Sequence, residues 1–168
     1  MCRLLTQRAS RFPQTTQMPP PLPNAVVALL GACGSGDVRI VAQLIREDER
    51  LLNASDNEGY TPLIVACSNG HKATARLLLS KGATADLSDN NGFTPLYVAC
   101  QNGHEALARL LLSKGASVDL SDNKGVTPLH LACQDGHEAT ARLLLSKGAS
   151  VDIPKSDGTT PQIGRAHV

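Results

Sequence analysis

The chain has 168 residues, 42% of them apolar, which is enough for one domain with a buried core. The formal net charge of +1 gives no reason to expect a nucleic-acid or membrane partner, and no apolar run approaches the length that spans a bilayer. Only two Phe and two Tyr occur, without Trp, so Leu, Ala, Val and Cys must fill the core.

The N-terminal residues 1–23 differ in composition from the rest of the chain. They contain Arg3, Arg8 and Arg11, no acidic residue, and a proline-rich run over residues 19–23. This composition predicts a disordered tail, or upstream sequence read through from a false start. Two alternatives are a mitochondrial or plastid transit peptide and a proline motif that binds an SH3- or WW-type groove.

Three nearly identical segments follow at a spacing of thirty-three residues. A fixed period of this length is typical of a solenoid, in which each repeat buries its apolar face against its neighbours. Such a chain offers a long surface and no obvious pocket. The recurring landmarks are Gly-x-Thr-Pro-Leu from Gly59, Gly92 and Gly125, Ala-Cys-x-x-Gly-His from Ala66, Ala99 and Ala132, and Ser-Lys-Gly-Ala from Ser80, Ser113 and Ser146.

This pattern resembles the ankyrin repeat over about residues 56–152. The resemblance implies an all-α repeat solenoid of stacked helix-turn-helix repeats with projecting β-turn fingers. It also implies a concave side, formed by the first helices and the finger tips, that contacts protein partners. The expected units are a degenerate capping repeat at residues 24–55 and ankyrin repeats at residues 56–88, 89–121 and 122–154.

Within one repeat, the residue types predict two short helices. Thr61 is expected to cap the first helix, Pro62 to occupy its first position and Gly70 to end it. A second helix is expected over residues 72–80, before Gly82. The stretches between repeats are rich in Asp, Asn, Ser and Gly, which favours projecting turns.

Cys67, Cys100 and Cys133 hold equivalent positions on successive first helices. Packed helices lie about 8–10 Å apart, whereas a disulfide needs Cα atoms within about 7 Å. We therefore expect buried free thiols, with Cys33 in the same place in the first repeat. Unpaired thiols fit a reducing compartment. The expected location is cytoplasmic, or an organelle if residues 1–23 are a transit peptide.

Neither metal nor cofactor binding is expected. His71, His104 and His137 are one repeat apart and cannot converge on a zinc ion. The family resemblance instead implies that they begin the second helices and hydrogen-bond the backbone of neighbouring turns. The aspartate-rich turns lack the glycine and glutamate of a calcium loop. Asp89 and Asp122 are therefore expected to brace adjacent fingers.

The sequence also contains no motif that indicates catalysis. It has no G-x-S-x-G, no P-loop and no G-x-G-x-x-G after a plausible strand. The glycine-rich residues 31–37 match the A-C-x-x-G landmark of the repeats. The segment is predicted to be non-enzymatic.

The expected partner contacts are the positions that differ between repeats. Aromatic side chains are favoured anchors at interfaces, so Tyr97 is the strongest candidate. Phe93 is expected either to contact a partner or to pack against a neighbouring finger. The candidates are Asn57, Glu58, Tyr60, Asn90, Asn91, Phe93, Asn123, Lys124 and Val126 at the tips, and Ile64, Ser68, Asn69, Tyr97, Gln101, Asn102, His130, Gln134 and Asp135 as exposed positions of the first helices.

The C-terminal residues begin a further repeat over residues 155–162 and then depart from it. Pro161 lies thirty-three residues after Pro128, but Gln162 stands where leucine is expected. The DNA sequence of a widely used short-read sequencing adapter, when one cytosine precedes it, translates as the last seven residues of the chain followed by a stop codon. Our hypothesis is that the natural chain differs from codon 162 onward and that residues 163–168 are adapter read-through, so the chain is a fragment.

Two functions remain open from the sequence. The first is an adaptor or scaffold that binds a protein partner on its concave face. The second is the regulatory or targeting arm of a larger enzyme, ubiquitin ligase subunit or channel. Nothing in the sequence indicates a homo-oligomer.

Overall fold

The structure is a computed structural model that describes residues 23–161, and every regular element in this range is a helix. The predicted N-terminal tail up to residue 22 and residues 163–168, for which adapter read-through is the hypothesis, lie outside the described residues. The elements are α1 (Pro23–Ser35), α2 (Val38–Glu47), the 3-10 helix η1 (Glu49–Asn53), α3 (Pro62–Ser68), α4 (Lys72–Ser80), α5 (Pro95–Gln101), α6 (Glu105–Ser113), α7 (Pro128–Gln134) and α8 (Glu138–Ser146).

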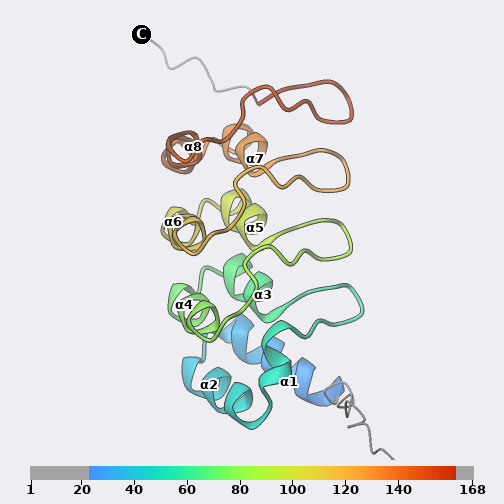
Figure 1. The fold of residues 1–168 in the computed structure, drawn as a ribbon, viewed down its shortest axis with the longest axis vertical. Coiled ribbons are helices and arrows are strands. Elements are labelled where there is room, and N and C mark those ends of the chain that lie inside the picture. The colour runs from blue at the N-terminus through green and yellow to red at the C-terminus, as the bar shows by residue number, and fades with distance from the viewer. Residues whose placement is uncertain (1–22, 162–168) are drawn as a thin grey trace, which may run out of the picture.

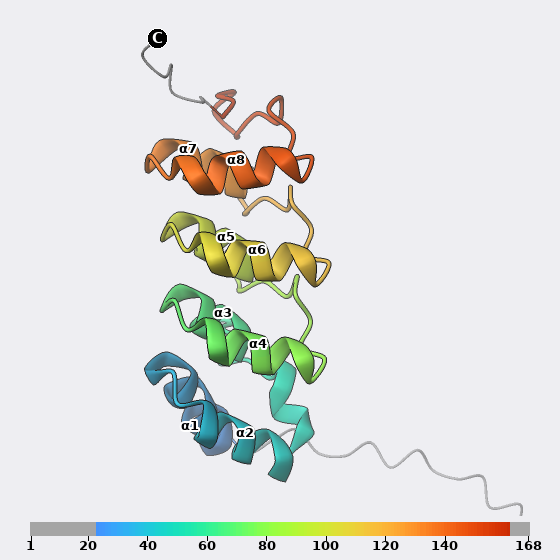
Figure 2. The same ribbon diagram turned by 90° about the vertical axis from the view of Figure 1, so that its left-hand side faces the viewer.

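The α-helices form pairs that stack along the long axis of the molecule (Figure 1). The first helices of the pairs, α1, α3, α5 and α7, lie in one column, and the second helices lie in another. The loops that precede α3, α5 and α7 project to one side, away from the second helices. Turned by a quarter, the pairs appear as successive layers (Figure 2). The chain is therefore the all-α repeat solenoid that the sequence predicts.

Capping residues decide where the first helices begin. Thr61 Oγ1 accepts a hydrogen bond from the backbone N–H of Ile64, and Pro62 takes the first helical position. Thr94 and Thr127 cap α5 and α7 in the same way. A threonine cap satisfies a free N–H group, and proline has no N–H to leave unpaired. The predicted start of the first helix is confirmed.

The second helices also end where the sequence predicts. Helix α4 covers Lys72–Ser80, and Gly82 follows it with a φ of 95°. This left-handed conformation, which glycine adopts without a Cβ clash, allows the N–H of Ala83 to donate to the carbonyl of Leu78 at 3.0 Å. On the second helices, Arg109 pairs with Glu105 at 2.6 Å and Arg142 pairs with Glu138 at 3.1 Å, each one helical turn apart.

The core is one continuous cluster that runs through all helix pairs. Within the α3/α4 pair, Leu63, Ala66 and Cys67 face Ala75 and Leu78, and all five are at most 1% exposed. Small residues on the first helix and leucines on the second fill the layer. Because each layer covers the next, the apolar face of a repeat is buried only by its neighbours.

The first helix pair departs from the pattern. Cys33 lies ten residues after the first residue of α1, whereas Cys67 lies five residues after the first residue of α3. When the repeats are aligned on this cysteine, the first residues of α1 are helical where the other repeats form a projecting loop. The second helix, α2, is capped by Asp37, whose Oδ1 accepts from two backbone N–H groups. Helix η1 takes up the longer connection to the next repeat.

Candidate protein-binding surface

We call the projecting loops fingers and name each by its residues: 56–60, 89–93, 122–126 and 155–159. An aspartate holds the 89–93 finger together, because Asp89 Oδ1 accepts from the N–H groups of Asn91 and Phe93 at 2.9 and 2.8 Å. The sequence predicted that such aspartates brace adjacent fingers. The Asp89 carboxylate instead braces its own finger, and of these two aspartates Asp122 alone also bonds another repeat, by accepting from Tyr97.

Asparagines connect one finger to the next. The backbone N–H of Asn90 donates to the carbonyl of Glu58 at 3.1 Å, and its side-chain Nδ2 donates to the carbonyl of Asn57 at 3.0 Å. Asn123 makes the corresponding bonds to Asn91 and Asn90, both at 3.0 Å. The side-chain donors of Asn90 and Asn123, two predicted partner contacts, are therefore engaged within the molecule.

Glycine makes this close approach possible. A Cβ atom at Gly59 would lie 2.8 Å from the backbone nitrogen of Asn90 and 2.9 Å from Asp89 Cα. At Gly92 the corresponding distances to Asn123 and Asp122 are 3.0 Å. The backbones of successive fingers pack so closely that a side chain on either glycine would push them apart.

The expectation that Ile64, Tyr97 and His130 are exposed is wrong. Their exposed fractions are 1%, 4% and 2%. Each is the third residue of its helix, and for Tyr97 and His130 the finger of the next repeat supplies a hydrogen-bond partner. Tyr97 Oη donates to Asp122 Oδ2 at 3.0 Å, and His130 Nε2 lies 3.4 Å from the carbonyl of Thr159. Tyr97 and His130 thus bond to the following repeat, and all three side chains are buried.

Tyr97, the strongest single candidate from the sequence, is a structural residue. Its ring stacks on Phe93 with a centroid distance of 4.6 Å and an angle of 10° between the planes. Burial, and then the bond to the Asp122 carboxylate, raise the pKa of its hydroxyl above the ordinary range. The Phe93 ring is half-buried in this stack, so it packs within its own repeat and shows only part of its surface.

His130 is held as a neutral ring. Its Nδ1 accepts from the backbone N–H of Thr127 at 3.1 Å, which places the ring proton on Nε2, toward the carbonyl of Thr159. Burial is the main cause of the lowered pKa of this imidazole. His130 therefore completes the cap of α7.

A groove of about 310 Å³ lies between α3 and α5 on the side of the first helices and fingers. Its apolar lining comes from Val65, Val98 and the aromatic rings of Tyr60 and Phe93. The polar lining comes from exposed side chains at the ends of the two helices, Ser68, Asn69 and Gln101.

The groove thus brings together six of the predicted contact residues, Tyr60, Ile64, Ser68, Asn69, Phe93 and Gln101, and adds two that the sequence reasoning missed. Val65 and Val98 were missed because they vary little between repeats. A usable signal existed, since each is an apolar residue outside the i, i+3, i+4 face that forms the core. An apolar position off the core face indicates a second buried or binding surface.

The other candidates are distributed along the same side. Asn102 links repeats, because its Nδ2 donates to the carbonyl of Ser68 at 3.1 Å. Val126 is half-buried at the base of its finger. The remaining candidates are exposed at the finger tips or at the ends of the first helices: Asn57, Glu58, Asn91, Lys124, Gln134 and Asp135.

A family model described as ankyrin repeats (three copies) matches residues 29–122 and 81–155. The chain belongs to the ankyrin repeat family. Over 54 residues it is 43% identical to the human transient receptor potential cation channel subfamily A member 1, covering 31% of this chain and 5% of the channel. Over 64 residues it is 38% identical to the human and mouse protein phosphatase 1 regulatory subunit 27, covering 38% of this chain and 41% of each relative. The match spans less than half of each relative.

His71, His104 and His137 precede the second helices, as the family resemblance implied, and two of them, His71 and His137, make the implied bond to neighbouring backbone. His71 Nε2 lies 2.9 Å from the carbonyl oxygen of Gly34, and His137 Nε2 lies 3.0 Å from that of Gln101. These two rings reach back to the end of the first helix of the preceding repeat. Among residues 23–161, no group of three His, Cys, Asp or Glu side chains is placed to hold a metal ion.

The cysteines of the ankyrin repeats are free thiols throughout the described range. Cys33, Cys67 and Cys100 are buried, as predicted, and burial raises the pKa of each to about 12. Cys133 is half-buried, with its pKa raised for the same reason. The buried three stay protonated at neutral pH and act as small apolar side chains. No helix in the described part is long and apolar enough to cross a bilayer.

Proposed function

We propose that this ankyrin repeat chain is an adaptor or scaffold that binds a protein partner on the side formed by its first helices and fingers. The groove between α3 and α5 carries this proposal. Its apolar lining by Val65, Val98 and the edges of Tyr60 and Phe93 suits an apolar side chain of the partner, and an apolar anchor in a pocket is what dominates most interfaces.

The rim of the groove supplies hydrogen bonds for the backbone on either side of that anchor. Ser68 and Gln101 are exposed and present a hydroxyl and an amide at the groove. Asn69 donates to the carbonyl of Val65 at 2.9 Å, which leaves its amide oxygen to accept from the partner. The rim carries no formal charge, so we expect selectivity for an apolar anchor in a protein segment and not for a nucleic acid.

The test uses a random peptide display library and the purified chain. Peptides selected on the chain should carry a large apolar residue and should shift the NMR signals of Val65, Ser68 and Gln101. Ser68→Trp, which fills the groove from an exposed helix end, should abolish their binding. Ser80→Trp is the matched control, because Ser80 is also exposed and also ends a helix, on the opposite side of the repeat. Peptides that bind Ser68→Trp unchanged would contradict the proposal.

A second candidate is that these repeats form the regulatory or targeting arm of a larger enzyme, ubiquitin ligase subunit or channel. The names of the two kinds of relative, a phosphatase regulatory subunit and a cation channel, favour this candidate. Sequencing the genomic locus past the Pro161 codon tests it. A catalytic or membrane domain in the same reading frame supports the arm, and further repeats followed by a stop support the adaptor.

We further propose that the protein works in the cytoplasm. The support is the set of unpaired thiols on successive first helices, which persist where glutathione keeps the compartment reducing. Imaging of the chain fused at its C-terminus to a fluorescent protein tests this location. Import into mitochondria or plastids that is lost on deletion of residues 1–23 would instead support a transit peptide.

A further inference from the structure

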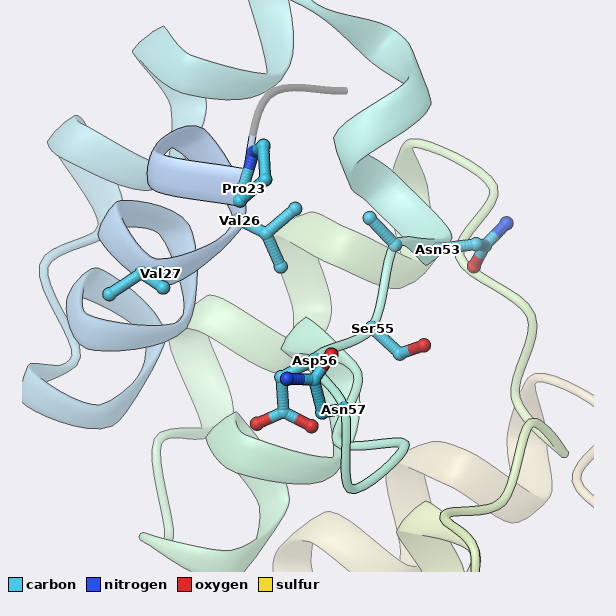
Figure 3. Close-up of a pocket in the computed structure, with 8 residues that line it drawn as sticks. Pro23, Val26, Val27, Asn53, Ser55, Asp56 and Asn57 are labelled. Carbon is cyan, nitrogen blue, oxygen red and sulfur yellow. The ribbon is translucent and has the colours of Figure 1, made fainter. Parts of the chain in front are cut away.

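A second pocket lies away from the groove, at the N-terminal end of the stack. It has a volume of about 460 Å³ and lies between the start of α1 and the 56–60 finger (Figure 3). Pro23, Val26 and Val27 line it from α1, and residues 53–57 line it from the other side. Val27 is 66% exposed, the largest fraction among the exposed large apolar residues of the described chain. In the later repeats, the corresponding side of a finger contacts the preceding finger.

The finger-to-finger bonds have one direction. The 89–93 finger donates to the 56–60 finger through the N–H and Nδ2 of Asn90. The 122–126 finger donates to the 89–93 finger through Asn123, and Ser156 N–H donates to the carbonyl of Lys124 at 2.9 Å. At every one of these steps the later finger gives the donor and the earlier finger gives a carbonyl.

Asn57 holds the equivalent position in the first finger, thirty-three residues before Asn90. It is exposed and lines the pocket, and neither its N–H nor its Nδ2 has a hydrogen-bond partner among the described residues. The open edge therefore presents donors and requires carbonyl groups.

We propose that residues 18–22 of this chain, Met-Pro-Pro-Pro-Leu, bind in this pocket and accept hydrogen bonds from Asn57. These residues lie outside the described range. Their sequence meets the requirement of the edge, because proline has a carbonyl and no N–H. Met18 and Leu22 supply apolar side chains for the wall formed by Val26 and Val27.

The connection of this segment to the pocket favours it over any other occupant. Residue 22 is bonded directly to Pro23, which itself lines the pocket. A segment tethered so closely has an effective concentration of the order of millimolar, above that of a second copy or a foreign chain. In this arrangement the proline-rich segment takes the place of the missing finger and caps the solenoid.

Hydrogen exchange measured by NMR on the full chain tests the proposal. The test variant replaces residues 18–22 with five glycines, and the control variant replaces residues 4–8 with five glycines. The proposal predicts that the backbone amide of Asn57 exchanges about tenfold faster in the test variant and at the native rate in the control. Asn90, which is bonded inside the finger stack, should exchange at the same rate in all three proteins and so reports that the fold is intact.

Two results would overturn the proposal. Equal exchange of Asn57 in the native chain and in the test variant means that residues 18–22 do not cover it. Protection of Asn57 that increases with protein concentration and survives the replacement means that a second copy occupies the pocket.

Discussion

The first helix pair and the internal pairs reach the same layered packing by different local means. Around α5, a threonine cap, a proline and a finger begin the repeat, and the finger bonds to neighbours on both sides. Around α1, extra helical residues replace the finger, and Asp37 caps the second helix in place of a histidine. The difference shows that the threonine cap, the proline and the finger of an ankyrin repeat are needed where the repeat contacts a neighbour on both sides. The first pair has one described neighbour and packs without them.

The largest effect that distinguishes these regions is expected at a finger glycine. Gly92→Ala should lower the free energy of unfolding by about 2–4 kcal/mol, because its φ is 87° and its Cβ would lie 3.0 Å from Asn123 and Asp122. Gly115→Ala is the matched control. Its φ is 89°, yet nothing lies within 4 Å of the added Cβ, so only the backbone strain of about 1 kcal/mol remains. Urea denaturation of both variants measures the difference, and equal losses would show that the fingers separate easily.

The next largest loss of stability is expected when the hydrogen bond from Tyr97 to the following repeat is removed. Tyr97→Phe should cost about 1–3 kcal/mol, because it removes the donor to a buried carboxylate oxygen of Asp122. Tyr60→Phe provides the comparison, since no hydrogen bond of the Tyr60 hydroxyl is present among the described residues, and its stability should stay within about 0.5 kcal/mol. The measurement is the thermal unfolding midpoint of each variant. A loss as large in Tyr60→Phe would contradict the assignment of Tyr97 as the residue that joins repeats.

A smaller effect is expected at the cap of the first pair. Asp37→Ala should lower stability by about 1 kcal/mol, because Asp37 Oδ1 accepts from the N–H groups of Arg39 and Ile40. Asp135→Ala removes an exposed aspartate that caps no helix N-terminus and should be neutral within about 0.5 kcal/mol. Exchange of the α2 amides localises the loss. If Asp37→Ala leaves these amides as protected as before, the aspartate does not stabilise the first pair.

The last test is a pH dependence. Burial lowers the pKa of His130 in the folded chain, so the unfolded chain binds a proton first as the pH falls. The stabilisation by neutral His130 is complete above the unfolded pKa of about 6.5 and is lost progressively below it. His130→Gln should therefore flatten the decrease in stability between about pH 7 and pH 5. An unchanged slope in urea titrations at the two pH values would exclude His130 as its source.

The sequence predicted well those features that depend on one repeat alone. The cap at Thr61, the proline start and the limits of α4 follow from local backbone requirements, and the structure confirms them. The buried thiols followed from the same repeat period. Each of these depends on side chains within a few residues in the chain.

The candidate site was predicted less well because exposure depends on the next repeat. Ile64, Tyr97 and His130 vary between repeats, as partner contacts do, but all three are buried, and Tyr97 and His130 bond to the following finger. Asn57 and Asn90 are the same residue in the same register, and only Asn90 has a preceding finger to bond. Neither difference can be read from a repeat considered alone.

The one-way bonding of the fingers also bears on how such a chain grows. Each thirty-three-residue unit carries donors on one edge and carbonyls on the other, so its two edges are complementary to each other. A unit copied in tandem by a duplication of its coding sequence meets a matching edge on both sides without any further substitution. Lengthening the solenoid then requires no new interface, and a change at one edge of a unit must be matched in every neighbour that contacts it.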